Sequence, residues 1–61
     1  MELDELHYKG WRIEVLHADA GWKALVYRPS SLLHEEPPPT GPDRHAVMED
    51  AKTLVDQRLL Q

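Results

Sequence analysis

Residues 11–28 read Trp-Arg-Ile-Glu-Val-Leu-His-Ala-Asp-Ala-Gly-Trp-Lys-Ala-Leu-Val-Tyr-Arg, and this stretch decides the fold. On both sides of residues 18–21, apolar side chains alternate with polar or bulky ones, which is the period of a β-strand. Trp, Ile, Val and Tyr are also the residue types that favour strands. Gly21 suits the last position of a hairpin loop, where glycine most easily adopts a left-handed backbone. We therefore predict a β-hairpin over residues 7–28.

The same stretch predicts how the two strands align. If residues 18–21 form the turn, His17 lies opposite Trp22 and Val15 lies opposite Ala24. A slip by one residue would mix charged side chains into the apolar face, so the pattern favours this register. One face of the hairpin then carries Trp11, Ile13, Val15, Trp22, Ala24 and Val26.

A proline-rich connector follows the hairpin over residues 29–42. Pro29 ends the second strand because proline has no N–H to donate to a ladder. Pro37–Pro39 favour an extended, stiff chain and exclude a helix or a central strand. Leu32 and Leu33 make residues 30–34 a candidate for a short third strand.

Residues 43–60 show the period of an amphipathic helix. We expect Thr40 or Gly41 as the N-cap and Pro42 in the first turn. The helix should pack on the apolar face of the hairpin and complete the core with Val47, Ala51, Leu54 and Val55. The predicted fold class is α+β, in one domain of 61 residues whose first six residues are frayed.

Charge and composition exclude several classes of function. The chain has seven basic and eleven acidic residues, a net charge of −4, and no cysteine. Disulfides and thiolate zinc sites are therefore impossible, and general nucleic-acid binding, which needs clustered basic residues, is disfavoured. The acidic N-terminal residues and the short apolar runs indicate neither a signal peptide nor a membrane span. We expect a cytoplasmic protein.

The sequence offers little for catalysis or metal binding. His34, Glu35 and Glu36, with Asp43 and His45 further on, are metal-binding residue types, but their spacing does not match a known ligand motif. A chain this short also has little room to enclose a substrate pocket. We therefore predict no catalytic, cofactor or metal site, and no enzyme activity.

The second face of the hairpin is the candidate binding site. One interpretation is an ordinary solvated face, with Glu14 near Lys23 and Arg12 stacked on Tyr27. The other is a contact surface for another protein or for a second copy in a weak homodimer. Its expected contact residues are Tyr8, Arg12, Leu16, Lys23, Leu25 and Tyr27.

A nucleic-acid-binding module is the alternative for the same face. Aromatic and basic side chains on one sheet face can stack on bases and hold phosphates, and Tyr8, Arg12, Lys23 and Tyr27 have this chemistry. Glu14 in the middle of the face and the acidic total charge work against it. A protein partner is therefore the preferred hypothesis.

The layout of hairpin, connector and helix resembles the N-terminal domain of the HicB antitoxin family. The matching segments are Gly21-Trp22-Lys23-Ala24, Pro29, Thr40 and the helical residues 46–51. Where that family has an Asp-Leu-Pro-Gly turn, this chain has Tyr-Arg-Pro-Ser at residues 27–30. The resemblance implies a small bacterial protein with an antitoxin-like role, whose partner would be a toxin-like ribonuclease with a basic surface.

Overall fold

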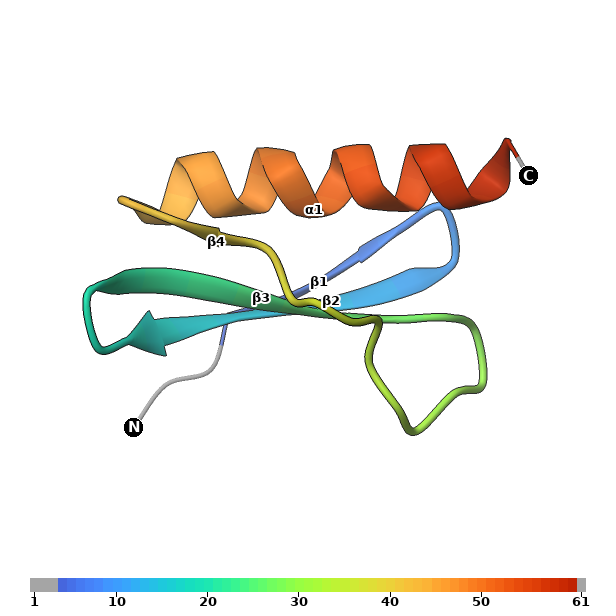
Figure 1. The fold of residues 1–61 in the computed structure, drawn as a ribbon. Helices are drawn as coiled ribbons and strands as arrows, with labels where there is room; N and C mark the ends of the chain where they lie inside the picture. Colours follow the sequence, from blue (N-terminus) through green and yellow to red (C-terminus); the bar gives the residue numbers. More distant parts are fainter. Residues whose placement is uncertain (1–3, 61) are drawn as a thin grey trace.

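A four-stranded antiparallel sheet is covered on one face by a single helix in the computed structural model, which describes residues 4–60 (Figure 1). The strands lie in the order β1-β2-β3-β4. The predicted α+β class is therefore confirmed, with two strands more than the hairpin alone. The elements are β1 (Asp4–Tyr8), β2 (Trp11–Ala18), β3 (Gly21–Tyr27), β4 (Thr40–Gly41) and α1 (Arg44–Leu59).

The β2–β3 hairpin has the register that the sequence predicted. His17 pairs with Trp22, and Val15 pairs with Ala24. Ala18 and Gly21 also pair with each other, so the loop is only two residues long, where four were expected. Gly10 is the one glycine of residues 4–60 with a positive φ, so the predicted left-handed conformation of Gly21 is wrong.

Strand β1 corrects the expectation that residues 1–6 are frayed. Asp4–Tyr8 pairs with β2 through a tight turn at Lys9 and Gly10, whose φ values of 54° and 86° match the mirror-image turns of two-residue hairpins. Tyr8 pairs with Trp11, so its side chain lies on the same face as Trp11. The expectation for residues 1–3 lies outside the described part of the chain.

The connector runs along the free edge of β3 and forms no strand over residues 30–34. His34 makes an isolated bridge to Tyr27, and the Glu35 N–H donates to the Val26 carbonyl oxygen at 2.7 Å. Further along, the Ala24 N–H donates to the Pro39 carbonyl oxygen at 3.0 Å, and β4 then pairs with β3. The candidate strand at residues 30–34 does not form, and residues 34–41 line the edge of β3 instead.

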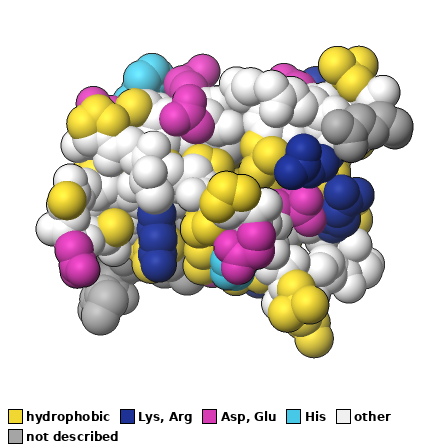
Figure 2. All heavy atoms as spheres, viewed as in Figure 1, with side chains coloured by type: hydrophobic (Ala, Val, Ile, Leu, Met, Phe, Trp, Pro, Cys, Tyr) yellow, Lys and Arg dark blue, Asp and Glu magenta, His cyan; other side chains and the backbone are white. Residues whose placement is uncertain are grey.

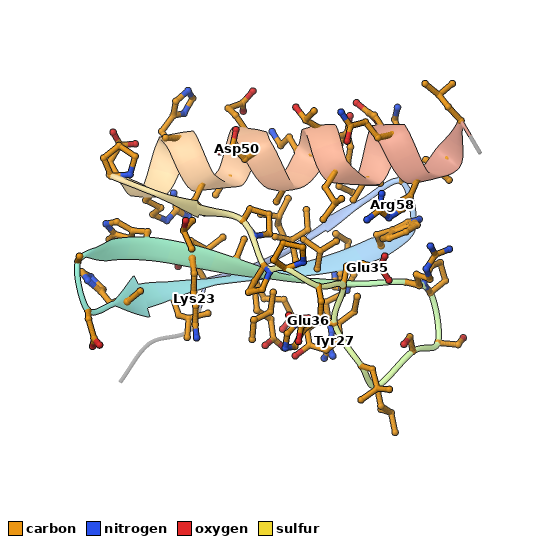
Figure 3. The ribbon with its side chains drawn as sticks, in the orientation of Figure 1. Lys23, Tyr27, Glu35, Glu36, Asp50 and Arg58 are labelled. Atoms are coloured by element: carbon orange, nitrogen blue, oxygen red, sulfur yellow. The ribbon has the colours of Figure 1, made fainter. Side chains whose placement is uncertain are left out.

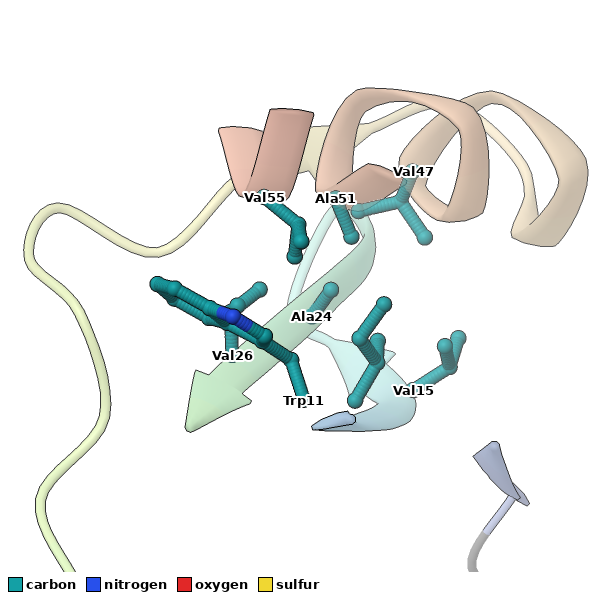
Figure 4. Close-up of a cluster of buried hydrophobic side chains, with 8 residues drawn as sticks. Trp11, Val15, Ala24, Val26, Val47, Ala51 and Val55 are labelled. Atoms are coloured by element: carbon teal, nitrogen blue, oxygen red, sulfur yellow. The ribbon is translucent and has the colours of Figure 1, made fainter. Parts of the chain in front are cut away.

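The core is one layer of side chains between the sheet and α1 (Figure 4). All the buried residues are ones that the sequence placed there: Trp11, Ile13, Val15, Ala24, Val26, Val47, Ala51 and Val55. Trp22 and Leu54 were also expected inside, but both are half-buried and pack at the margin of this layer.

Asp43 is the N-cap of α1, and its Oδ1 accepts a hydrogen bond from the Ala46 N–H at 2.8 Å. The expected caps, Thr40 and Gly41, belong to β4, because pairing with β3 holds them in extended backbone. Pro42 accordingly precedes the cap and is not part of the first turn. Within residues 4–60, no helix has the length and apolar character needed to cross a membrane.

Candidate interaction face

The side of the sheet that faces away from α1 is called the outer face here. The alternation of side chains along β1, β2 and β3 defines its members. Figure 3 shows the labelled side chains of Lys23 and Tyr27 pointing away from the helix. The strand residues of the outer face are Glu5, His7, Arg12, Glu14, Leu16, Lys23, Leu25 and Tyr27.

Arg12 and Tyr27 form one end of the outer face, and they stack as the sequence predicted. They are direct cross-strand partners, and the Arg12 guanidinium carbon lies 4.2 Å from the centre of the Tyr27 ring. A second contact joins Arg12 Nη1 to Glu14 Oε2 at 3.4 Å. The His34 ring approaches Tyr27 edge-on, at 6.0 Å between centroids. Arg12 and His34 together restrict what else can reach the Tyr27 ring.

Leu16 and Leu25 form the apolar part of the outer face. Leu25 lies opposite Glu14 and Leu16 lies opposite Lys23, so the two leucines are diagonal neighbours across β2 and β3. Both are half-buried although no helix covers them. Glu14, expected near Lys23, has Leu25 as its direct neighbour and makes its ion pair with Arg12. The result is a small apolar centre bordered by charged side chains.

Tyr8 does not belong to this face, which corrects one of the expected contact residues. Its hydroxyl donates to the carboxylate of Asp56 on α1, at 3.1 Å from each oxygen. Lys9 Nζ lies 2.8 Å from the same carboxylate. The hydrogen bond from Lys9 lowers the pKa of Asp56 and raises that of Lys9. Tyr8 therefore fastens the β1–β2 turn to the helix.

The structure also shows a charged cluster that the sequence analysis missed. Glu35 accepts from Arg28 Nε at 3.0 Å and from Arg58 Nε at 3.1 Å. Figure 3 labels Glu35 and Arg58 side by side, and Figure 2 shows an acidic group between basic ones at this end of the molecule. These bonds, above all the one from Arg28, lower the pKa of Glu35. Separations of 7 and 23 residues give no local pattern by which sequence reading could find the cluster.

The groove beside the β2–β3 loop, one of the open hollows in the described part of the chain, has few polar side chains. This open groove of about 610 Å³ lies between residues 18–22 and residues 40–42. Its lining is mostly small side chains and backbone around Trp22, with Asp19 as the one titratable side chain. His17 stacks on Trp22 beside it, at 3.8 Å between ring centroids. Asp19 and Thr40 are the polar side chains among the lining residues of this groove.

The metal-type residues of the connector stay apart from one another. His34 Nδ1 lies 3.9 Å from Glu36 Oε1, which is an ion-pair distance. The Glu35 carboxylate accepts hydrogen bonds from Arg28 and Arg58, and the Asp43 carboxylate caps the helix. Within residues 4–60, no three histidine, aspartate or glutamate side chains come together as a metal site.

All the expected contact residues except Tyr8 therefore lie on the outer face. Arg12, Leu16, Lys23, Leu25 and Tyr27 lie there together on two neighbouring strands. The resemblance to the HicB antitoxin family stays a prediction. Comparison with protein-family models, curated proteins and solved structures gave no match for this chain.

Proposed function

We propose that this protein is a non-enzymatic interaction module that binds another protein through the outer face. The observation that carries this proposal is the pair of Leu16 and Leu25, which form an apolar centre that no described element covers. Arg12, Lys23 and Tyr27 border this centre. An apolar centre with a polar rim that includes an arginine and an aromatic side chain is typical of protein–protein contact surfaces.

The chemistry of the partner follows from charge and from the family resemblance. A net charge of −4 favours a partner with a basic surface, since opposite charges accelerate and orient the encounter. A toxin-like ribonuclease in the cytoplasm has this property, and the HicB resemblance suggests it. Both the antitoxin-like role and the cytoplasmic location are part of this proposal.

A nucleic-acid platform has less support than a protein contact surface. Tyr8, one of its expected stacking residues, is bonded to Asp56 on the helix side. Arg12 already covers the ring of Tyr27, and Glu14 lies between Arg12 and the leucines. One of the two expected aromatic surfaces is therefore absent from the face, and the other is partly occupied.

The test compares Leu25→Lys with Leu33→Lys as a matched control. Leu25 lies at the centre of the outer face, whereas Leu33 is 80% exposed in the connector. The wild-type protein serves as bait in an extract of the native host, and the captured protein is then purified and titrated by calorimetry. We expect Leu25→Lys to weaken the Kd at least 10-fold, because it puts a charge in the apolar centre, and Leu33→Lys to leave it unchanged.

Two outcomes would overturn this proposal. One is equal affinity of the wild type and Leu25→Lys for the purified partner. The other is saturable binding of single-stranded RNA that shifts the amide signals of Arg12, Lys23 and Tyr27, which supports the platform instead.

A further inference from the structure

The outer edge of β1 presents backbone groups that the sheet does not use. Tyr8 and Trp11 close a two-residue turn, so they form a hydrogen-bonded pair, and such pairs alternate with non-bonded ones along an antiparallel ladder. Tyr8, Leu6 and Asp4 therefore bond to β2. The N–H and C=O groups of Glu5 and His7 point away from β2, toward the free edge.

Strand β3, at the other side of the sheet, shows the same alternation of inward- and outward-pointing backbone groups. Ala18 and Gly21 close the loop between β2 and β3, so Ala24 and Val26 should direct their backbone groups away from β2. These two residues make the observed bonds to the connector, from the Ala24 N–H and to the Val26 carbonyl oxygen. The alternation therefore identifies outward-pointing groups correctly in this sheet.

The two edges of the sheet differ in their protection. Residues 34–41, with three consecutive prolines, cover the edge of β3. Within residues 4–60, nothing pairs with the outer edge of β1, and β1 contains no proline, glycine or bulge. Native proteins usually block such an edge or pair it with another strand. The short strand β1 carries the charges of Asp4 and Glu5, so a strand that pairs with it must match them.

We propose that the edge of β1 pairs with β1 of a second copy, antiparallel, about a two-fold axis at Leu6. The outward N–H and C=O groups of Glu5 and His7 must bond to the same groups of the second copy. Within β1, a two-fold axis at Glu5, Leu6 or His7 allows this, so three symmetric registers are possible. The first places Glu5 against Glu5, and the third places His7 against His7. Only the register centred on Leu6 places Glu5 of each copy opposite His7 of the other, so opposite charges meet twice when His7 is protonated.

The helix side of β1 accommodates the second copy. In this register the half-buried Leu6 meets its own copy at the axis, and Asp4 lies opposite Tyr8 of the other chain. Asp4 keeps its ion pair with Arg44 of its own helix, and Lys52 of the other copy, whose Nζ lies 5.9 Å from the Tyr8 ring there, lies on the same side of the sheet. Because α1 lies over β2 and β3 and strands are about 4.8 Å apart, the two helices would be roughly 19 Å apart, which exceeds a helix diameter.

This dimer uses the backbone of β1 with Glu5 and His7 at the margin of the outer face, whereas the proposed function rests on Leu16 and Leu25 on β2 and β3, so different variants test the two proposals. A double substitution tests the register. In the single variant His7→Glu, Glu5 of each copy faces a carboxylate at position 7 of the other copy, so like charges meet at two places. The double variant Glu5→Lys with His7→Glu restores opposite charges at both places. Within one chain, His7 Nε2 already lies 3.7 Å from Glu5 Oε2, residue 7 lies opposite Arg12, and residue 5 lies opposite Glu14. His7→Glu loses the contact with Glu5 but gains Arg12 as an opposite charge, and the double variant restores opposite charges at positions 5 and 7 within the chain as well as between the copies.

Sedimentation equilibrium at pH 5.5 gives the readout. We expect a concentration-dependent dimer for the wild type, a dimer dissociation constant at least 10-fold weaker for His7→Glu, and recovery to the wild-type value or better in the double variant. Leu25→Lys, on the outer face, should leave the dimer intact. A monomer at millimolar wild-type concentration would overturn the proposal, as would a dimer that Leu25→Lys dissociates and His7→Glu does not. Failure of the double variant to recover would overturn the register centred on Leu6.

Discussion

The residue type at a single position can be set by the closeness of a neighbouring backbone atom as well as by the backbone conformation of the residue itself. Gly21 has no positive φ, yet a Cβ built on it would lie 2.5 Å from the Gly41 carbonyl oxygen. That distance is shorter than real Cβ contacts, and the atom it meets is backbone. Glycine is therefore required because the backbone of β4 at Gly41 lies directly against the start of β3, and not because the turn needs a left-handed residue.

Gly21→Ala should consequently destabilise the protein although alanine suits a strand better than glycine does. The added methyl group must push β4 away, and overpacking of this kind costs about 1–3 kcal/mol. Urea unfolding monitored by tryptophan fluorescence measures the change, with Ala20→Ser in the exposed loop as the control. A Gly21→Ala protein as stable as the wild type would show that β4 moves freely.

Among the elements, the connector between β3 and α1 makes specific contacts at both of its ends. Its far end pairs with β3 as β4, and its near end is tied to α1 through Glu35, which bridges Arg28 and Arg58. Arg28 also lies over the Trp11 ring, at 5.1 Å from its centre. The tip of the connector is its most exposed part, with Leu32 at 91% and Leu33 at 80% exposure.

Glu35→Gln should lower the free energy of unfolding by about 1 kcal/mol at pH 7, because a charge-assisted bridge becomes a neutral one. The folded pKa of Glu35 is lowered below the ordinary value of 4.5. The bridge therefore stabilises the protein above pH 4.5, and this contribution is lost as the pH falls through the folded pKa. Chemical unfolding between pH 3 and pH 7 should show the two proteins converging in acid.

Glu36→Gln is the matched control for this measurement, because its side chain is 71% exposed and makes only the distant contact to His34. Its unfolding free energy at pH 7 should equal that of the wild type. A constant difference between Glu35→Gln and the wild type at every pH would contradict the bridge as its cause.

For the whole molecule, the core is one thin layer, and a single large side chain closes one end of it. Trp11 is 3% exposed and packs between the sheet and the helix (Figure 4). Trp22 lies at the other end, half-buried beside the open groove and stacked on His17. The two tryptophans are equivalent in the sequence pattern but unequal in burial.

Trp11→Ala should therefore cost about 3–5 kcal/mol, which approaches the total stability of a domain this small. Trp22→Ala should cost clearly less, because its side chain gives up less buried area. Circular dichroism during urea unfolding compares the two variants independently of tryptophan emission. Equal losses, or a larger loss for Trp22→Ala, would contradict this ranking.

Most of the expected contact residues lie on the sheet face predicted for them, because side chains in a strand alternate strictly. Arg12, Leu16, Lys23 and Leu25 fall on one face once the hairpin register is known. Tyr8 was misplaced because the alternation was continued through Lys9 and Gly10, where a two-residue turn starts a new strand. Lys-Gly is a weaker turn signal than Asn-Gly or Asp-Gly.

The sequence by itself determined the features that depend on periodicity: the hairpin register, the span of the helix, and the apolar side chains that form the core. The tertiary structure alone decided the features that depend on distant neighbours. Thr40 and Gly41 are a strand and not a cap because β3 pairs with them, and Glu35 lies between arginines far from it in the chain. Local sequence patterns report the period of each element, but they do not report which elements meet when the chain folds.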